Sequence, residues 1–225
     1  MKFQAVFLDI DDTLFDFRKS SFEALVTAFA EIGVSFTEAD MPHYEVYNNR
    51  MWEMFERGEI EKEHIYEERF RLYFAERGIE ADTAAFNRKY LYELAEGVNF
   101  MPHCAELLRV LHGRVKVFSL TNGDTYAQER RIEKSGFAPY CDGVFISEQL
   151  GCKKPEKAFY DKVFSLIGEE YRGCTLMVGD SLSSDMQGGR NAGIPTCFYG
   201  KREKADARCD YVIEDLLELP PLLGI

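Results

Sequence analysis

The sequence predicts an α/β fold, a doubly wound parallel sheet formed by residues 1–15 and 99–225, with a helical domain at residues 16–98 inserted after the first strand. Three observations predict this fold class. An unbroken apolar run near the N-terminus is typical of a strand buried on both faces, as strands of parallel sheets are. Helical periodicity then fills the inserted stretch. From Met101 onward, helical and strand patterns alternate, as they do in right-handed βαβ units.

The first predicted strand, AVFL at residues 5–8, runs directly into the acids Asp9, Asp11 and Asp12. Three carboxylates this close together at the end of a buried strand repel one another strongly, which favours a bound cation there. We expect Mg²⁺, because it prefers hard oxygen ligands. It often takes only one or two protein carboxylates, while water and substrate phosphate complete its coordination.

The inserted stretch shows four groups of apolar residues at helical spacing, each followed by a glycine that can end a helix: Gly33, Gly58, Gly78 and Gly97. Short connections of this kind are typical of a helical bundle. The groups are Phe22, Leu25, Val26, Phe29 and Ile32; Met51, Trp52, Met54 and Phe55; Ile65, Tyr66, Phe70, Tyr73 and Phe74, with Arg69 in the same stripe; and Phe86, Tyr90, Leu91 and Leu94.

The second half of the chain predicts helices and strands in alternation. Helices are expected at residues 104–111, after residue 125 and at 156–167, and strands at 115–120, 144–146, 175–178, 196–199 and 211–213. In such sheets the functional site lies beyond the carboxyl ends of the strands, where the strand order reverses. Polar segments follow three of the strands: the acids at 9 and 11, TNG at 121–123 and GDS at 179–181.

Composition restricts the possible partners. The chain has 225 residues, 46% of them hydrophobic and 14% aromatic, and a formal net charge of −12. Nucleic acid polymers and anionic membranes require clustered lysine and arginine, so we expect neither as a partner. A small anionic substrate fits, since a metal ion and one or two lysines reverse the field locally. With no signal-peptide pattern and no long apolar run, we expect a cytoplasmic protein whose six cysteines are free thiols.

Four segments in order resemble the motifs of the haloacid dehalogenase-like (HAD) hydrolases: DIDDTL at residues 9–14, LTN at 120–122, KP at 154–155 and GDSLSSD at 179–185. The resemblance covers essentially the whole chain. It implies a Rossmann-like HAD core, and it implies that the insert, lying between the first and second motifs, is a helical cap domain that shields the site from water.

The resemblance also implies the catalytic roles. Asp9 is expected to attack phosphorus and form an aspartyl-phosphate, and Asp11 to protonate the leaving group and then activate water. Thr121 is expected to donate a hydrogen bond to a phosphoryl oxygen, although a threonine after a strand is otherwise an ordinary turn residue. Lys154 is expected to neutralise the nucleophile and the phosphoryl group. Its neighbour Lys153 is the rival assignment, expected to be a charge at the rim.

The same resemblance assigns the metal ligands. The carboxylates of Asp9 and Asp180 and the backbone carbonyl of Asp11 are expected to bind Mg²⁺. Asp185 is expected to orient a metal-bound water or Lys154 from behind these ligands. Asn122, next to Thr121, is expected to contact substrate. The glycine-rich segment at 188–193 is interpreted as close helix packing, because it lacks the lysine of a nucleotide-binding loop.

A closer resemblance, to bacterial pyrimidine 5'-nucleotidases, rests on FDFRKS at residues 15–20, NNRMW at 48–52, GEI at 58–60 and LTNG at 120–123. It suggests that Arg18, Asn48, Asn49 and Trp52 face the substrate. The indole could stack on a base and the amides could read its edge. Packing in the core of the bundle is an equal alternative for Trp52.

The resulting hypothesis is a Mg²⁺-dependent phosphomonoester hydrolase, a 5'-nucleotidase on pyrimidine nucleoside monophosphates, working as a monomer or homodimer on a small phosphorylated metabolite. A sugar-phosphate or phosphoglycolate phosphatase is the first alternative, since only the cap would differ. A haloacid dehalogenase is less favoured, because Asp11 and the Lys154-Pro155 pair suit phosphoryl transfer. A non-catalytic protein on this scaffold would most simply lack Asp9 or Asp180, and both are present.

Overall fold

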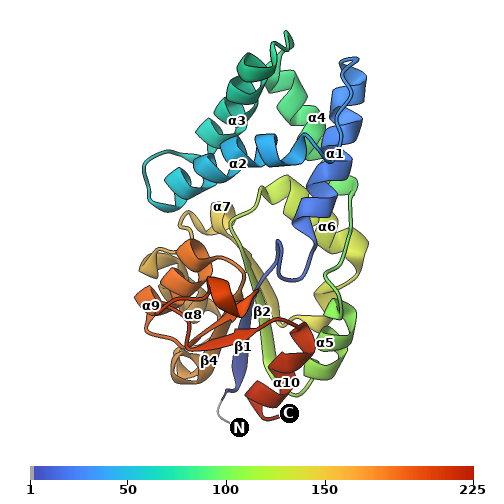
Figure 1. The fold of residues 1–225 in the computed structure, drawn as a ribbon. Coiled ribbons are helices and arrows are strands. Elements are labelled where there is room, and N and C mark those ends of the chain that lie inside the picture. The colour runs from blue at the N-terminus through green and yellow to red at the C-terminus, as the bar shows by residue number, and fades with distance from the viewer. Residues whose placement is uncertain (1–2) are drawn as a thin grey trace. The chain divides into compact units, whose positions relative to one another are not determined.

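The computed structural model describes residues 3–225, and the chain forms two compact units (Figure 1). Unit 1, the sheet unit, consists of Met1–Phe17 and Val98–Ile225, and unit 2, the helical unit, consists of Arg18–Gly97. Residues 1 and 2, which our domain prediction assigned to the sheet unit, lie outside the described residues. The helical unit therefore interrupts the sheet unit once, directly after its first strand.

A six-stranded sheet forms the centre of the sheet unit, with the strand order β3-β2-β1-β4-β5-β6. Every neighbouring pair is parallel. The predicted α/β class and parallel sheet are confirmed. The strands are β1 (Ala5–Asp9), β2 (Lys116–Thr121), β3 (Gly143–Ile146), β4 (Thr175–Gly179), β5 (Thr196–Tyr199) and β6 (Tyr211–Ile213).

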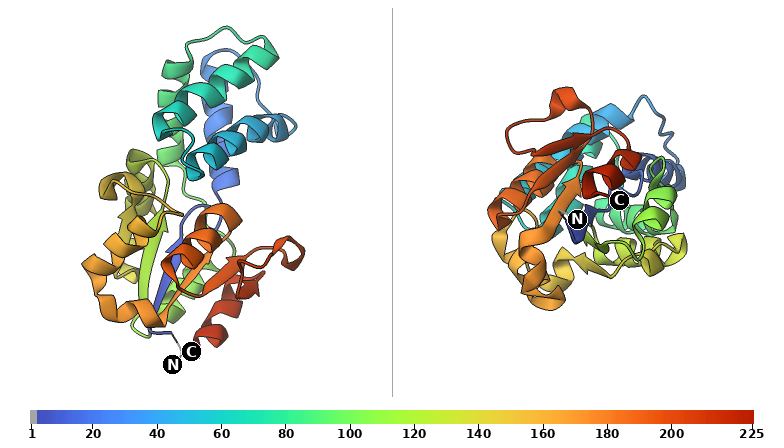
Figure 2. Two further views of the ribbon diagram at one scale, coloured as in Figure 1. Left: turned by 90° about the vertical axis from the view of Figure 1, so that its left-hand side faces the viewer. Right: turned by 90° about the horizontal axis from the view of Figure 1, so that it is seen from below.

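Helices cover both faces of this sheet. The longer ones are α5 (Cys104–Leu111), α6 (Thr125–Ser135) and α8 (Lys157–Ile167). The short ones are α7 (Ser147–Leu150), α9 (Gln187–Ala192) and α10 (Leu219–Leu223), the 3-10 turns η1 (Ala138–Tyr140), η2 (Glu169–Cys174), η4 (Arg202–Lys204) and η5 (Leu216–Glu218), and the π-helical segment η3 (Leu182–Met186). Figures 1 and 2 show the orange helices α8 and α9 on one face and the green α5 and red α10 on the other.

Side-chain alternation along β1 explains the two layers. Val6 and Leu8 belong to the apolar cluster shared with α5, α6 and α10, whereas Ala5 and Phe7 belong to the cluster shared with α8 and α9. Because successive residues of a strand point to opposite faces, a strand between two helical layers must be apolar throughout. All five residues of β1 are buried, Asp9 at its end included.

The helical unit has an aromatic core of its own. Its helices are α1 (Phe17–Glu31), which begins at the last residue of the sheet unit's first segment, α2 (Met41–Glu56), α3 (Lys62–Arg77) and α4 (Thr83–Glu96). Phe29 stacks on Phe36 with ring centroids 4.8 Å apart and also contacts Phe86 at 4.6 Å. Asp82 caps α4 by accepting hydrogen bonds from two backbone N–H groups, and Gly78 ends α3 in the left-handed conformation.

The chain leaves and re-enters the sheet unit at neighbouring points. Phe15 and Phe100 form an antiparallel bridge. The backbone N–H of Asp16 donates to the carbonyl of Asn99, and that of Met101 donates to the carbonyl of Leu14, each at 2.9 Å. This two-stranded link closes the sheet unit at the insertion point without using residues of the helical unit.

Other sequence expectations can be compared with the same structure. All six cysteines are free thiols. Within residues 3–225, no helix combines the length and apolarity needed to cross a membrane. α2 begins ten residues before the apolar positions we used to place it, because its first turns carry polar and aromatic residues and Pro42. Pro42 suits a first turn, where its missing N–H has no partner to lose.

Candidate active site

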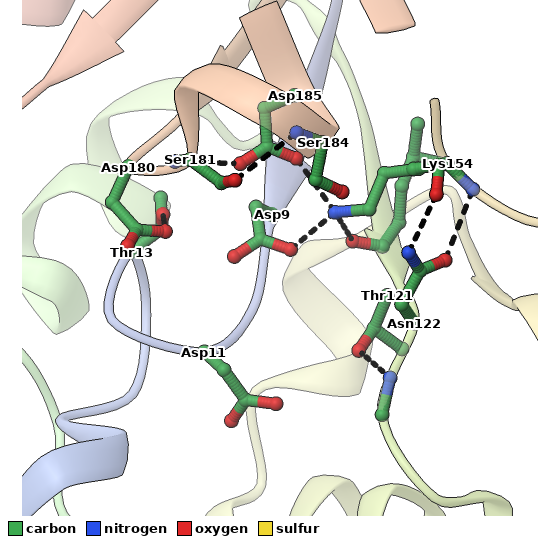
Figure 3. A network of polar contacts seen from close by, with 12 residues as sticks. Asp9, Asp11, Thr13, Thr121, Asn122, Lys154, Asp180, Ser181, Ser184 and Asp185 are labelled. Carbon is green, nitrogen blue, oxygen red and sulfur yellow. Dashed lines mark hydrogen bonds and ion pairs between the residues drawn. The ribbon is translucent and has the colours of Figure 1, made fainter. Parts of the chain in front are cut away.

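The strand order brings the sequence motifs to one edge of the sheet. β1 lies between β2 and β4, with Asp9 beside Leu120 and Leu8 beside Val178 in register. The residues that follow these three strands are therefore neighbours, although they are far apart along the chain. Figure 3 shows the polar network that they form.

Lys154 joins two of the carboxylates. Its ammonium contacts one oxygen of Asp9 and lies 2.7 Å from Asp185. All three side chains are buried. Burial by itself would lower the pKa of Lys154, but the charges of Asp185 and Asp9 raise it above its usual value, so the lysine stays protonated.

The backbone of Lys154 is fastened to the end of β2. The side-chain amide of Asn122 donates to the Lys154 carbonyl at 2.8 Å and accepts from its N–H at 3.0 Å. The ammonium also donates to the carbonyl of Leu120 at 3.1 Å. The amide of Asn122 is thus directed at the Lys154 backbone, where it helps to place the ammonium, and its contact to substrate stays a prediction.

Three carboxylates, those of Asp9, Asp180 and Asp185, each offer an oxygen within 4.8 Å of the others. One ammonium against three carboxylates leaves an excess of negative charge in a buried place. Burial raises the pKa of Asp9 well above its usual range, opposed by Lys154, and burial together with the charges of Asp9 and Asp185 does the same to Asp180. A set of hard oxygen donors with unbalanced charge fits a divalent cation.

The two further acids differ in how the protein uses them. Asp185 lies in η3, where one oxygen contacts Lys154 and the other accepts the backbone N–H of Ser181 at 3.1 Å. Asp180 directly follows β4, and one of its oxygens accepts a hydrogen bond from Thr13 at 3.3 Å. Because both oxygens of Asp185 already serve protein groups, Asp180 is the better placed of the two as a direct metal ligand.

Thr121 ends β2 with its hydroxyl oxygen already accepting two hydrogen bonds. The donors are the backbone N–H of Gly123 at 2.9 Å and the side-chain amide of Gln128 at 3.0 Å. A hydroxyl has two lone pairs and one proton, so the proton is left to donate. Thr121 is thus prepared to donate to an anionic oxygen.

Asp11 lies apart from the three clustered carboxylates. Figure 3 shows its carboxylate pointing away from that of Asp9, on the side where Thr121 lies. It contacts Gln128 and Arg131 of α6, at 2.5 Å each. Sequence reasoning missed these two residues. The available signal was their spacing of three positions next to apolar Ala127 and Ile132, which places polar groups on the buried face of a helix.

The other predicted site residues belong to the helical unit, and the structure shows their surroundings there. Arg18 is half exposed and forms ion pairs with Glu38 and Glu45. Asn48 is buried, and its carbonyl oxygen accepts from Tyr44 and from Arg69. Asn48 also donates to the side chain of its predicted companion, Asn49, at 3.4 Å. Trp52 is half-buried and packs edge-on against Phe55.

The motifs, the sheet topology and the clustered acids define a hydrolase fold and site, and comparison with known families agrees. The haloacid dehalogenase-like hydrolase family matches residues 3–193. The chain therefore belongs to the haloacid dehalogenase-like hydrolases and is an enzyme. The resemblance predicted from the four motifs is confirmed.

Relatives of similar length match along nearly the whole chain. The HAD-hydrolase YfnB of Bacillus subtilis is 31% identical, with 100% of this chain and 97% of YfnB covered. The pyrimidine 5'-nucleotidase YjjG of Escherichia coli is 33% identical, with 99% of each chain covered. The pyrimidine 5'-nucleotidase PynA of Streptococcus pneumoniae is 36% identical, with 88% of this chain and 84% of PynA covered.

Solved structures show the same fold. The crystal structure of YfnB, which contains magnesium, superposes with a TM-score of 0.94 at 31% identity and covers 100% of both chains. The L-2-haloacid dehalogenase of Xanthobacter autotrophicus superposes with a TM-score of 0.76 at 19% identity, covering 99% of this chain and 98% of that one. At that identity the likeness concerns the fold alone.

Proposed function

We propose that this protein is a Mg²⁺-dependent phosphomonoesterase that works through an aspartyl-phosphate, and that its substrates are pyrimidine nucleoside 5'-monophosphates. The observation that carries the reaction type is the buried cluster of Asp9, Asp180 and Asp185 around the ammonium of Lys154, at the carboxyl ends of β1 and β4. The names of YjjG and PynA support the substrate class.

The proposed metal site uses the carboxylates of Asp9 and Asp180 and the backbone carbonyl of Asp11, with Asp185 behind them. When bound, the ion would supply positive charge to the phosphoryl oxygens and offset the repulsion among the carboxylates. The oxygen-only donor set and its unbalanced negative charge fit a hard divalent cation.

The chain's own groups would carry the two chemical steps. A carboxylate oxygen of Asp9 forms a bond to phosphorus while the bond from phosphorus to the ester oxygen breaks, and Asp11 gives that oxygen a proton. Water then attacks phosphorus, Asp11 takes a proton from it, and the bond to Asp9 breaks to release phosphate. Lys154 and the Thr121 hydroxyl stabilise the negative charge of the transferring group in both steps.

The substrate preference is proposed to come from the helical unit, acting as a cap. Arg18, Asn48, Asn49 and Trp52 are the proposed contacts to the nucleotide. For Trp52, packing on the bundle stays a full alternative, because the indole already contacts Phe55. Trp52→Ala separates the two: loss of stacking raises the KM for nucleotides, whereas loss of packing lowers the melting temperature and leaves the KM unchanged.

A small sugar phosphate is the second candidate substrate. Relatives with such names also match: the N-acylneuraminate-9-phosphatase of Homo sapiens over 58% of this chain at 33% identity, and the glyceraldehyde 3-phosphate phosphatase of Pyrococcus furiosus over 100% at 27% identity. These enzymes would use the same core chemistry. Only a comparison of substrates separates the two candidates.

The test is phosphate release with Mg²⁺ across pyrimidine and purine nucleoside monophosphates, sugar phosphates and phosphoglycolate. We expect the highest kcat/KM with a pyrimidine nucleotide, and loss of activity with EDTA and with Asp9→Asn. A sugar phosphate in first place would overturn the substrate class alone. Full activity of Asp9→Asn would overturn the mechanism, and metal-independent halide release from a 2-haloacid would revive the dehalogenase alternative.

The broader expectations for this protein stay predictions. They are a cytoplasmic location, a monomeric or homodimeric state, and no nucleic acid polymer or membrane as partner. The net charge of −12 supports the last of these, because both surfaces are themselves anionic.

A further inference from the structure

Helix α6 presents two buried polar side chains to Asp11. Gln128 and Arg131 are each 1% exposed, and both reach the loop after β1 from more than a hundred residues away. The proposed chemistry so far assigns them nothing. Their contacts show what they hold in place.

The two side chains divide the carboxylate of Asp11 between them. A guanidinium N–H of Arg131 donates to Oδ1, and the amide of Gln128 donates to Oδ2. Asp11 is on a loop and its side chain is 25% exposed, so without partners it would sample several rotamers. With a separate donor on each oxygen, both its position and its orientation are set by α6.

Gln128 also couples Asp11 to Thr121. Its amide nitrogen donates to Thr121 at 3.0 Å in addition to Asp11, so a single side chain fixes the separation of two proposed catalytic groups. Gly123 makes room for it, since a Cβ at that position would lie 2.2 Å from the Gln128 nitrogen. The close approach of the Gln128 amide to the loop after β2 therefore depends on Gly123.

Arg131 is costly to bury. Its guanidinium lies 4.7 Å from the centroid of Phe15, and among the described residues its Nε and Nη2 have no hydrogen-bond partner. The ion pair with Asp11 is the compensation that the structure shows. An apolar side chain of similar length would fill the same space without this desolvation cost. What the arginine adds is a fixed contact to one carboxylate.

We infer that Gln128 and Arg131 are positioning residues that set the orientation of the Asp11 carboxylate, the group proposed to exchange a proton with the leaving group and then with water. The inference rests on the proposed phosphatase function. It makes a prediction that depends on the substrate: an alkoxide leaving group needs the proton as the bond to phosphorus breaks, whereas nitrophenolate is stable enough to leave without it.

The experiment measures kcat/KM for p-nitrophenyl phosphate and for the alkyl phosphate that the unmodified enzyme hydrolyses fastest. The ratio kcat/KM reports steps up to the first irreversible one, here the departure of the leaving group. The main variant is Arg131→Met, and Asp11→Asn sets the full effect of losing the proton donor. Arg130→Met is the matched control, because Arg130 directly precedes Arg131 in α6 but is exposed and pairs with Glu133.

We expect Arg131→Met to lower kcat/KM for the alkyl ester about 100-fold and for the nitrophenyl ester at most about threefold, the pattern of a lost general acid. Arg131→Lys should restore part of the alkyl activity, because an ammonium can still hold one oxygen of Asp11. Arg130→Met should leave both values unchanged. An equal loss for both esters in Arg131→Met, or no loss, would overturn the inference.

A thermal melt shows whether Arg131→Met folds. If it does not, Gln128→Leu tests the same inference. This variant frees Thr121 as well, so we expect a small loss with the nitrophenyl ester and a clearly larger one with the alkyl ester. An equal loss with both would count against the inference. An unmodified enzyme that hydrolyses neither ester would instead refute the proposed function.

Discussion

Asn122 illustrates how one buried side chain can fix the backbone of a proposed catalytic residue, Lys154. It accepts from the N–H and donates to the carbonyl of Lys154, and it is buried. Asn122→Asp keeps the acceptor, removes the donor and places negative charge beside a carbonyl. An unpaired buried carbonyl costs about 1–3 kcal/mol, so we expect a loss of that size in the free energy of unfolding, measured with urea.

Asn191→Asp is the matched control for this prediction. Asn191 donates in the same way to the next carbonyl, that of Pro155, at 2.8 Å, but it is exposed, so water can replace the lost bond. We expect a change below about 0.5 kcal/mol. If the two variants lost equal stability, the stabilising effect of the hydrogen bonds between Asn122 and the Lys154 backbone would not come from their burial.

The crowded carboxylates predict an unusual dependence of stability on pH. Burial, with the charges of Asp9 and Asp185, raises the pKa of Asp180 in the folded protein above its ordinary value of 3.8. Above pH 3.8, Asp180 therefore keeps its proton in the folded protein but loses it in the unfolded chain. Because the folded state then binds more protons, the contribution of Asp180 to the free energy of unfolding falls as pH rises. Asp180→Asn cannot ionise, and it should therefore gain stability relative to the unmodified protein as pH increases from about 4.

The measurement for Asp180 is urea unfolding of both proteins in EDTA at several pH values. The difference in unfolding free energy between the two proteins should widen with pH. It should narrow when Mg²⁺ is added, because the unmodified protein offers the ion one more carboxylate than the variant does and is therefore stabilised more. A difference that stays constant with pH would contradict the raised pKa.

The sequence alone identified the motif residues but not the side chains that hold them in place. Asp9, Asp180 and Lys154 were found because each stands at the end of an apolar strand or inside a recognisable motif. Gln128 and Arg131 act only through the fold, which brings α6 to the loop after β1, so no local pattern assigns them to Asp11. Asn122 was found, but the direction of its amide depends on the path of a distant loop.

At the scale of elements, the turn from β4 into η3 depends on Gly179. A Cβ at this position would lie 2.2 Å from Oδ2 of Asp185, the oxygen that accepts from Ser181. Gly179→Ala should displace Asp185 and with it the contact to Lys154. We expect a loss of about 1–3 kcal/mol in unfolding free energy together with reduced phosphate release.

Gly173→Ala is the control that tests whether the losses expected for Gly179→Ala come from the crowding of Asp185. Gly173 lies in η2, just before β4, and nothing stands within 4 Å of the Cβ it would gain. We expect its melting temperature and phosphate release to match those of the unmodified protein. Similar defects in both variants would mean that the loss comes from glycine backbone freedom rather than from the crowding of Asp185.

Long, periodic helices were predictable and short helices were not, whereas even the short strands β5 and β6 have the predicted bounds. α5 has the predicted bounds, and α3 and α6 end at glycines in the left-handed conformation, as such C-caps usually do. α7 and η3 escaped prediction because four or five residues are too few to show a helical period. η3 matters most among these, since it carries Asp185.

On the scale of the whole molecule, the sheet unit is complete without the helical unit. Its two segments meet at the bridge between Phe15 and Phe100 and pair through Asp16 and Asn99. The residues of the proposed acid cluster, with Lys154, Thr121, Gln128 and Arg131, all belong to this unit. The proposed catalytic groups and the proposed contacts to the nucleoside part of the substrate are thus on separable parts of the chain.

Replacing residues 18–97 by a short Gly-Ser linker tests that separation. Because the two ends of the insert start from paired backbone, a short linker can join them, and we expect the sheet unit to unfold cooperatively on its own. It should still release nitrophenolate from p-nitrophenyl phosphate with Mg²⁺ and lose this activity with Asp9→Asn.

The substrate preference of the shortened protein tests the proposed role of the cap. Its kcat/KM values for pyrimidine nucleotides and for sugar phosphates should lie within about tenfold of each other, because the binding contacts that would supply specificity have been removed. A shortened protein that folds but keeps the full preference for one nucleotide would place the specificity in the sheet unit instead, and would remove Arg18, Asn48 and Trp52 from the proposed site.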